Sequence, residues 1–177
     1  YTLSDPAVLV HIGRFNEQKN HAGMLRSFAM LLQSWPNATL RIVGDGELRQ
    51  AVEEQAVAMG IRERVEFVGS QSNVHPFLQG ADLFLLPSSY EGMPMTVIEA
   101  MGTALPIVAT RVGGLADMLC HEQSGLLTDC DEAAVADACV RLLRDQQLRS
   151  RLGTAALEES RRFGADHMAI QYCLLYN

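Results

Sequence analysis

Short apolar runs alternate along the chain with longer segments that have the 3.6-residue period of amphipathic helices. We predict strands, mostly buried on both faces, at residues 8–12, 39–43, 65–68, 83–86, 106–109 and 125–127. We predict helices at residues 20–35, 47–59, 73–79, 94–102 and 131–143. This alternation predicts an α/β domain, a Rossmann-like doubly wound parallel sheet of about six strands. In such sheets ligands bind beyond the carboxyl ends of the strands, so the chemistry is expected in the loops there.

Composition limits the class of protein and its partners. The 177 residues are 48% hydrophobic, which predicts one globular domain over residues 1–177. The net charge of -7, with only 14 Lys+Arg, argues against nucleic acid or anionic lipid as a bulk partner. No apolar run approaches the roughly 20 residues that span a bilayer, and the first residues lack the pattern of a signal peptide. The chain starts at Tyr1 rather than Met, so we interpret it as a piece of a longer protein.

The four cysteines show no C-x-x-C pairing. Structural thiols in a reducing, cytoplasmic compartment are favoured over a metal or disulfide framework. The triplet Asp129-Cys130-Asp131 has the D-x-D form of metal-dependent sugar transfer, but Asp131 is better interpreted as the N-cap of the helix that follows. His11 lies within an apolar run and is expected to be a core or site-edge group rather than a catalytic base.

The segment 88–101 carries the strongest chemical signal. It follows an apolar run, turns at Gly92 and starts a helix with Pro94 close to the first helical position. A helix N-terminus offers backbone N–H groups and a partial positive charge, both of which attract phosphate. Glu91 and Glu99, eight residues apart, flank this site and can accept hydrogen bonds from hydroxyls. The segment therefore suits a sugar attached to a diphosphate.

The loop after the first apolar run holds two cations. Gly13 forms a turn, and Arg14 and Lys19 follow it on the way into a helix. The two cations could close on one anion, the arginine through its planar fork and the lysine as a movable point charge. The alternative is a pair of surface cations at the start of a helix.

The other loops give weaker signals. Gly44 and Gly46 allow close backbone approach, but Arg49 stands where a dinucleotide fingerprint needs its third glycine, which argues against NAD. Gly69 opens a loop that borders a flat base or is an ordinary connection. We expect a plain turn at residues 110–114.

Six separately placed motifs carry a resemblance to a known family. They are Gly13-Arg14 with Lys19-Asn20, Val43-Gly44-Asp45-Gly46, Phe67-Val68-Gly69, Ala81-Asp82 with Pro87-Ser88, Glu91-Gly92-Met93-Pro94 through Glu99-Ala100-Met101, and Gly113-Gly114. In this order the chain, over about residues 6–165, resembles the C-terminal, donor-binding half of the retaining GT-B glycosyltransferases of group 1 (family 4). Glu91 and Glu99 match the two glutamates of that family's E-x7-E motif.

The resemblance implies a role for each matched position. Arg14 and Lys19 would neutralise the donor diphosphate and the charge that grows on it as the glycosidic bond breaks, and Glu91 would lie near the transferred sugar. Glu99 would hold the ribose hydroxyls. The remaining donor-binding positions are Gly13, Gly44, Gly69, Gly92, Met93, Pro94, Met95 and Thr96, with Pro94 unable to donate a hydrogen bond. The resemblance implies no metal and no other cofactor. It leaves open whether retention proceeds through an ion pair or a covalent intermediate.

The resemblance also implies partners. The chain would bind a nucleotide diphosphate sugar for a hexosyltransferase-type reaction onto a glycan or lipid-linked acceptor, as in polysaccharide biosynthesis. The acceptor site would belong to an N-terminal domain absent from this chain, with residues 165–177 forming the helix that crosses back to it. We therefore expect weak donor binding and little or no transfer by this chain alone. The expected location is cytoplasmic, with peripheral contact to the inner face of the membrane through the missing domain.

Two alternative functions stay open. One is a non-catalytic nucleotide-sugar-binding module that has kept the fold, which the intact Arg14, Lys19, Glu91 and Glu99 disfavour. The other is a GT-B epimerase or phosphorylase, although no cofactor lysine site of a phosphorylase is found. The sequence leaves the base, the sugar and the acceptor open.

Overall fold

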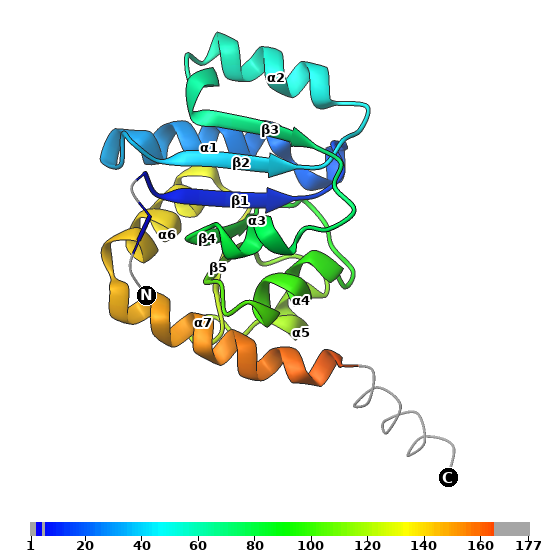
Figure 1. The fold of residues 1–177 in the computed structure, drawn as a ribbon, viewed down its shortest axis with the longest axis vertical. Helices are drawn as coiled ribbons and strands as arrows, with labels where there is room; N and C mark the ends of the chain where they lie inside the picture. The colour runs from blue at the N-terminus through cyan, green and yellow to red at the C-terminus, as the bar shows by residue number, and fades with distance from the viewer. Residues whose placement is uncertain (1–2, 5, 165–177) are drawn as a thin grey trace.

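A computed structural model describes residues 3–4 and 6–164 and shows one six-stranded sheet (Figure 1). The strands are β1 (Val8–Ile12), β2 (Thr39–Val43), β3 (Val65–Gly69), β4 (Leu83–Leu86), β5 (Ile107–Thr110) and β6 (Leu126–Thr128). All neighbours pair in parallel, in the order β3-β2-β1-β4-β5-β6. This order confirms the predicted doubly wound sheet. Chain order runs outward in one direction from β1 to β3 and in the other from β4 to β6, so the topological switch point lies between β1 and β4.

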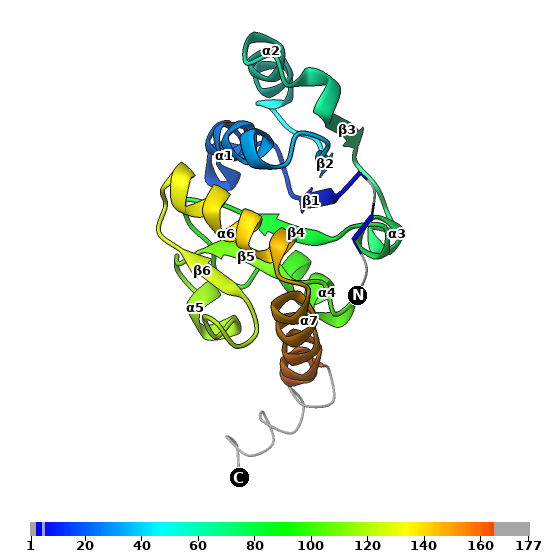
Figure 2. The same cartoon turned by 90° about the vertical axis from the view of Figure 1, so that its left-hand side faces the viewer.

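Helices cover both faces of the sheet (Figure 2). One face packs on α1 (His21–Ser34), α2 (Arg49–Ala58) and α6 (Glu132–Arg144). The other packs on α3 (His75–Gln79), α4 (Met95–Gly102), α5 (Leu115–Met118) and the C-terminal half of α7 (Gln146–Ser160). Successive strand residues point to opposite faces. Leu85 therefore joins the first core while Phe84 and Leu86, its neighbours in β4, join the second. Burial on both sides is why these runs are continuously apolar.

Most predicted helices are confirmed with small shifts at their ends. Helix α1 begins after Asn20, which adopts a left-handed backbone (φ 50°) and accepts a hydrogen bond from the Gly23 N–H. Pro94 is the N-cap of α4 rather than a residue of its first turn. Asp131 caps α6, as predicted, by accepting from the Ala134 N–H at 2.8 Å.

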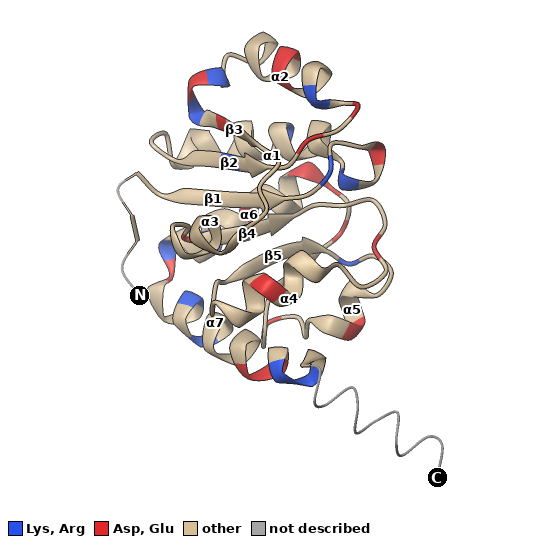
Figure 3. Cartoon of the chain, turned by 45° about the vertical axis from the view of Figure 1, so that its right-hand side comes forward, with Lys and Arg blue, Asp and Glu red and all other residues tan. Residues whose placement is uncertain are grey.

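Two helices were not given bounds by the sequence pattern. Helix α5 has only four residues and follows a loop that was predicted as a plain turn. Helix α7 lies in a charge-rich region expected to be helical, and it packs beside α4. Residues of both charge signs are interspersed on the outer surfaces of α2 and α7, as expected of solvated helix faces (Figure 3). Short 3-10 helices occur at Glu17–Lys19, Arg62–Arg64 and Arg161–Phe163.

Three further expectations concern the C-terminal end of the chain, membrane-spanning segments and the cysteines. The crossover helix predicted at 165–177 lies outside the described residues. No helix in the part of the chain that the structure describes combines the length and apolar composition needed to cross a membrane. The three cysteines within that part, Cys120, Cys130 and Cys139, are free thiols.

Candidate functional site

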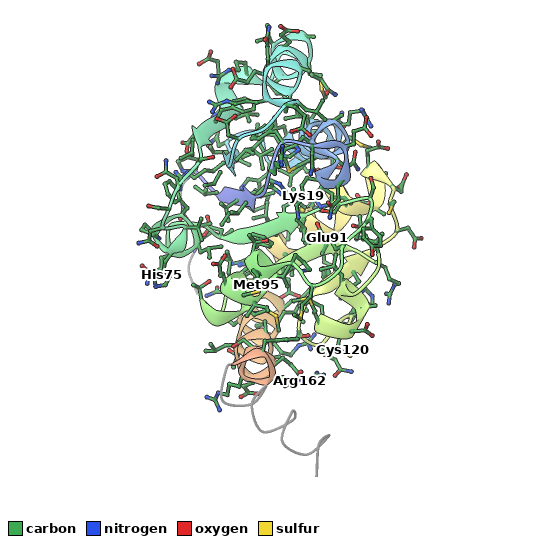
Figure 4. All side chains as sticks on the ribbon, turned by 90° about the vertical axis from the view of Figure 1, so that its right-hand side faces the viewer. Lys19, His75, Glu91, Met95, Cys120 and Arg162 are labelled. Atoms are coloured by element: carbon green, nitrogen blue, oxygen red, sulfur yellow. The ribbon has the colours of Figure 1, made fainter. Side chains whose placement is uncertain are left out.

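The predicted site residues gather where the strand order reverses. The loop after β1 carries Lys19, and the loop after β4 carries Glu91, so both lie at the carboxyl edge of the sheet beside the switch point. Figure 4 views this edge and shows the two side chains next to one another, with Met95 of α4 close by. Neighbouring parallel strands whose order reverses open a crevice there, which is where such sheets bind ligands.

Lys19 and Glu91 form a largely buried ion pair. The Lys19 Nζ lies 2.6 Å from Glu91 Oε1, and the two side chains are 14% and 4% exposed. The same carboxylate oxygen accepts from Ser88 Oγ at 2.6 Å, and Gln18 Nε2 donates to Glu91 Oε2 at 3.3 Å. Lys19 is the only lysine among the 14 basic residues of the chain. The site thus holds one compact positive charge that is paired with a fixed carboxylate.

The local sequence explains why Lys19 lies there. Asn16 caps the 3-10 turn by accepting from the Lys19 N–H at 3.2 Å. Asn20 then takes the left-handed conformation, which few residue types tolerate, and donates through Nδ2 to Pro87 O at 3.1 Å. The Ser89 N–H donates to Gln18 O at 2.8 Å. Polar side chains and backbone therefore tie the loop after β1 to the loop after β4.

Arg14 does not share an anion position with Lys19 in this structure. Its guanidinium pairs with Glu47 at 3.2 Å, and its side chain is 72% exposed. The pKa of Glu47 is lowered mainly by a hydrogen bond from its own backbone N–H, with Arg14 adding a smaller contribution. An exposed ion pair contributes little net free energy, because water screens the two charges. The Arg14 side chain can therefore turn toward a stronger anion at little cost.

Three of the predicted glycines meet at the ends of β1, β2 and β3. The Gly44 N–H donates to Gly69 O at 2.9 Å, and a Cβ on Gly44 would lie 2.0 Å from Gly13 O. A Cβ on Gly13 would lie 2.9 Å from His11 Nε2 and 3.2 Å from Lys19 Cε. Side chains are thus excluded where the backbone loops approach one another and Lys19.

A stack of rings lies beneath this loop. His21 packs on Phe15 with centroids 4.2 Å apart and meets His11 edge-on at 4.9 Å. His11 is fully buried and donates through Nδ1 to Leu85 O at 2.9 Å, which confirms it as a core group. Burial lowers the pKa of His11 well below its usual value and that of His21 to about 4. Both rings are therefore neutral at pH 7.

Helix α4 supplies the second half of the site. Its N-cap is Pro94, and no side chain caps its first turn. The Val97 N–H donates to Pro94 O at 3.1 Å, which leaves the N–H groups of Met95 and Thr96 to face an anion. Met93 and Met95 are exposed there, and Thr96 carries a buried Oγ1 that has no hydrogen-bond partner among the described residues. Glu99 lies four residues after Met95, about 6 Å along the helix axis.

Glu99 borders a cavity of about 490 Å³ between α3 and α4. Polar residues line its other side: Gln71, Ser72 and Asn73 of the loop before α3, and His75 at the start of that helix. Within the described chain, the Glu99 carboxylate has neither an ion-pair partner nor a hydrogen-bond partner. It is therefore free to accept hydrogen bonds from a ligand in the cavity.

The sequence did not single out Gln18, Phe15 or His21, and it included Ser88 only as part of a matched motif, with no role of its own. Gln18 and Ser88 are common polar residue types in loops, so residue type alone gives no signal for either. No group of three or more His, Cys, Asp or Glu among the described residues is arranged to hold a metal ion.

Comparison with known proteins gives consistent matches. The family model of glycosyl transferases group 1 matches residues 2–159. The chain is 34% identical, over 99% of its length, to a lipopolysaccharide core biosynthesis glycosyltransferase of Rhizobium meliloti, and 32% identical, over 96%, to N-acetyl-alpha-D-glucosaminyl L-malate synthase of Bacillus anthracis. It covers 51% and 45% of these two proteins, so the chain spans about half the length of the curated relatives it matches.

Solved structures show the same fold. Sucrose-phosphate synthase of Thermosynechococcus elongatus superposes with a TM-score of 0.87 at 28% identity over 96% of this chain and 44% of that one. HepE of Anabaena in complex with UDP gives 0.86 at 23% identity over 96% and 49%. The C-terminal domain of a group 1 protein of Francisella tularensis gives 0.81 at 17% identity, covering 90% of this chain and 87% of that domain. With the family model matching most of its length, this chain belongs to the glycosyl transferases group 1.

Proposed function

We propose that this chain is the donor-binding half of a retaining, family 4 glycosyltransferase, which moves a hexose from a nucleoside diphosphate sugar to a glycan or lipid-linked acceptor. The observation that carries this proposal is the order of groups along the crevice at the switch point. Lys19, the uncapped N-terminus of α4 and the cavity beside Glu99 follow one another there. In that order, the three groups suit the sugar-bearing phosphate, the second phosphate and the nucleoside of the donor.

The chemistry needs positive charge where the leaving group develops negative charge. As the glycosidic bond breaks, electrons move onto the diphosphate oxygen, and Lys19 with the dipole of α4 would stabilise that charge. Arg14 would add a second cation by leaving its exposed contact with Glu47. These groups would take the place of a metal ion, so we propose a donor site that needs no metal.

Glu99 would bind the ribose. Its free carboxylate would accept hydrogen bonds from the two ribose hydroxyls, while the polar loop before α3 borders the base. That HepE has been solved with UDP supports a nucleoside diphosphate as the ligand class.

The acceptor belongs to a part of the protein beyond this chain. The curated relatives are about twice as long, and we propose that an N-terminal domain supplies the acceptor site and any peripheral contact with the inner face of the membrane, in the cytoplasm. This chain alone would then bind donor weakly and transfer sugar poorly.

Calorimetric titration of the chain with UDP, GDP, ADP and their hexose conjugates tests the proposal. We expect at least one nucleotide to bind, and Lys19→Ala to weaken it about tenfold or more, because a charge-assisted hydrogen bond contributes about 1.5–3 kcal/mol. Glu99→Ala should weaken nucleotides similarly. Inorganic pyrophosphate separates the two roles, since only Lys19→Ala should reduce its affinity.

Glu158→Ala is the matched control for Glu99. Glu158 is an exposed helical carboxylate one turn before Arg162, which Figure 4 places well away from Lys19 and Glu91. This variant should bind like the parent. The proposal fails if the parent binds none of the nucleotides, or if Lys19→Ala and Glu99→Ala both bind as tightly as it does. Robust sugar transfer by this chain alone would contradict the assignment of the acceptor site to another domain.

A further inference from the structure

Gln18 makes three hydrogen bonds between the two loops that form the candidate site. Its carbonyl accepts from the Ser89 N–H at 2.8 Å, and its side-chain Nε2 donates to Tyr90 O at 2.9 Å and to Glu91 Oε2 at 3.3 Å. Gln18 precedes Lys19, yet its side chain serves the loop more than 70 residues away. A half-buried amide thus fastens one loop to the other.

Hydrogen bonds from both loops converge on the carboxylate of Glu91. Oxygen Oε1 already accepts from Lys19 Nζ and Ser88 Oγ, both at 2.6 Å, and Oε2 accepts from Gln18. Ser88 is fully buried, and its carbonyl accepts from Thr110 Oγ1 at 2.6 Å, which fixes it in turn. Donors on both oxygens hold the carboxylate plane in one orientation. The orientation of Glu91 sets where the Lys19 ammonium lies.

We propose that Gln18 is a positioning residue of the donor site, which orients Glu91 and through it presents Lys19 to the donor diphosphate. This inference rests on the proposed function. One N–H of the Lys19 ammonium is used by Glu91, so two remain for phosphate oxygens without breaking the pair. An ammonium held in place loses less side-chain freedom on binding, so the held pair should bind phosphate more tightly than a free lysine would.

The test compares Gln18→Met with the parent in UDP binding, and in GDP or ADP binding if one of these binds more tightly. Methionine has nearly the length of glutamine but no N–H donor. We expect a loss of affinity of about three- to tenfold, the size of one or two net hydrogen bonds. If Gln18 only filled space, methionine would retain the parent affinity.

Gln50→Met is the matched control. Gln50 also donates to a glutamate, Glu54 at 2.9 Å, but on the exposed surface of α2. This variant should bind like the parent. In a Lys19→Ala background, Gln18→Met should change affinity less than about twofold, because its effect acts through Lys19. An equal loss in both backgrounds would overturn the inference.

The single lysine gives an independent readout. Side-chain ¹⁵N NMR of this chain reports one lysine ammonium, which a buried ion pair protects from exchange with water. Gln18→Met should broaden or shift that signal, whereas Gln50→Met should leave it unchanged. If Gln18→Met leaves both the ammonium signal and the nucleotide affinity unchanged, the inference about Gln18 fails and the proposed function still stands. Absence of nucleotide binding by the parent would sink the proposed function as well.

Discussion

Gly113 packs against the backbone of Glu91 so closely that a Cβ on Gly113 would lie 1.9 Å from the Glu91 carbonyl oxygen. Gly113 also has a left-handed backbone (φ 47°), and the next N–H, from Gly114, donates to the same carbonyl at 2.9 Å. The loop after β5 therefore supports the loop that carries the candidate catalytic carboxylate. A glycine is required there for both its conformation and its lack of a side chain.

Gly113→Ala should destabilise the fold and weaken nucleotide binding together. The left-handed backbone alone costs alanine about 1–2 kcal/mol, and the contact with Glu91 adds to it, so we expect a loss above about 2 kcal/mol in urea unfolding. Gly102→Ala is the control for stability, since open space surrounds that position at the end of α4. Equal stability of the two variants would contradict the close contact.

Lys19→Met should destabilise the chain by about 3 kcal/mol, because it leaves the Glu91 carboxylate buried without its counter-charge. The double variant Lys19→Met, Glu91→Gln should lose less free energy of unfolding than Lys19→Met alone, since no buried charge is then left unpaired. Arg26→Met removes an exposed pair with Glu132 and should cost under about 1 kcal/mol. A double variant less stable than Lys19→Met would argue against the pair.

Stability should fall as pH drops from 7.5 to 5, in part because of His21. Burial lowers its folded-state pKa to about 4 against an ordinary 6.5, so the unfolded chain takes up the proton first and gains stability as pH falls. The contribution lost by pH 5 is about 2 kcal/mol. His11, shifted in the same direction, adds to the loss.

Urea unfolding of His21→Phe at both pH values checks this. The variant should lose about 2 kcal/mol less than the parent between pH 7.5 and 5. His75→Phe, at an exposed position, should follow the parent. If His21→Phe loses as much as the parent, His21 does not carry the effect.

Asp82→Asn should destabilise the start of the sheet by about 2 kcal/mol. Asp82 is 2% exposed, and its two carboxylate oxygens accept from the Ser4 N–H at 2.9 Å and the Val8 N–H at 2.8 Å. Asparagine keeps only one acceptor oxygen and points its NH₂ at one of these two N–H donors. Asp117→Asn, on the exposed surface of α5, should change unfolding by under about 0.5 kcal/mol. Similar losses in both would refute the role given to Asp82.

Much of the fold was predictable because burial leaves a local signature. Strands covered on both faces must be apolar throughout, so the runs around Leu9 and Phe84 were visible, and the regular alternation with helices indicated the parallel sheet. Helix α5 was missed because four residues are too short to show a helical period. The N-cap at Pro94 shifted by one position because helix ends carry weak signals.

The sequence by itself indicated that Arg14, Lys19 and Glu91 lie in loops that follow strands and that Glu99 lies in the helix after one of these loops, and hence that all four lie near one edge of a sheet. Only the tertiary structure decided their partners. It joined Lys19 to Glu91 across 72 positions and left Arg14 with Glu47 instead. It also placed Gln18 and Ser88 on the two oxygens of Glu91. Periodicity reports whether a side chain is buried, whereas a hydrogen bond depends on distances between atoms that only the packed loops fix.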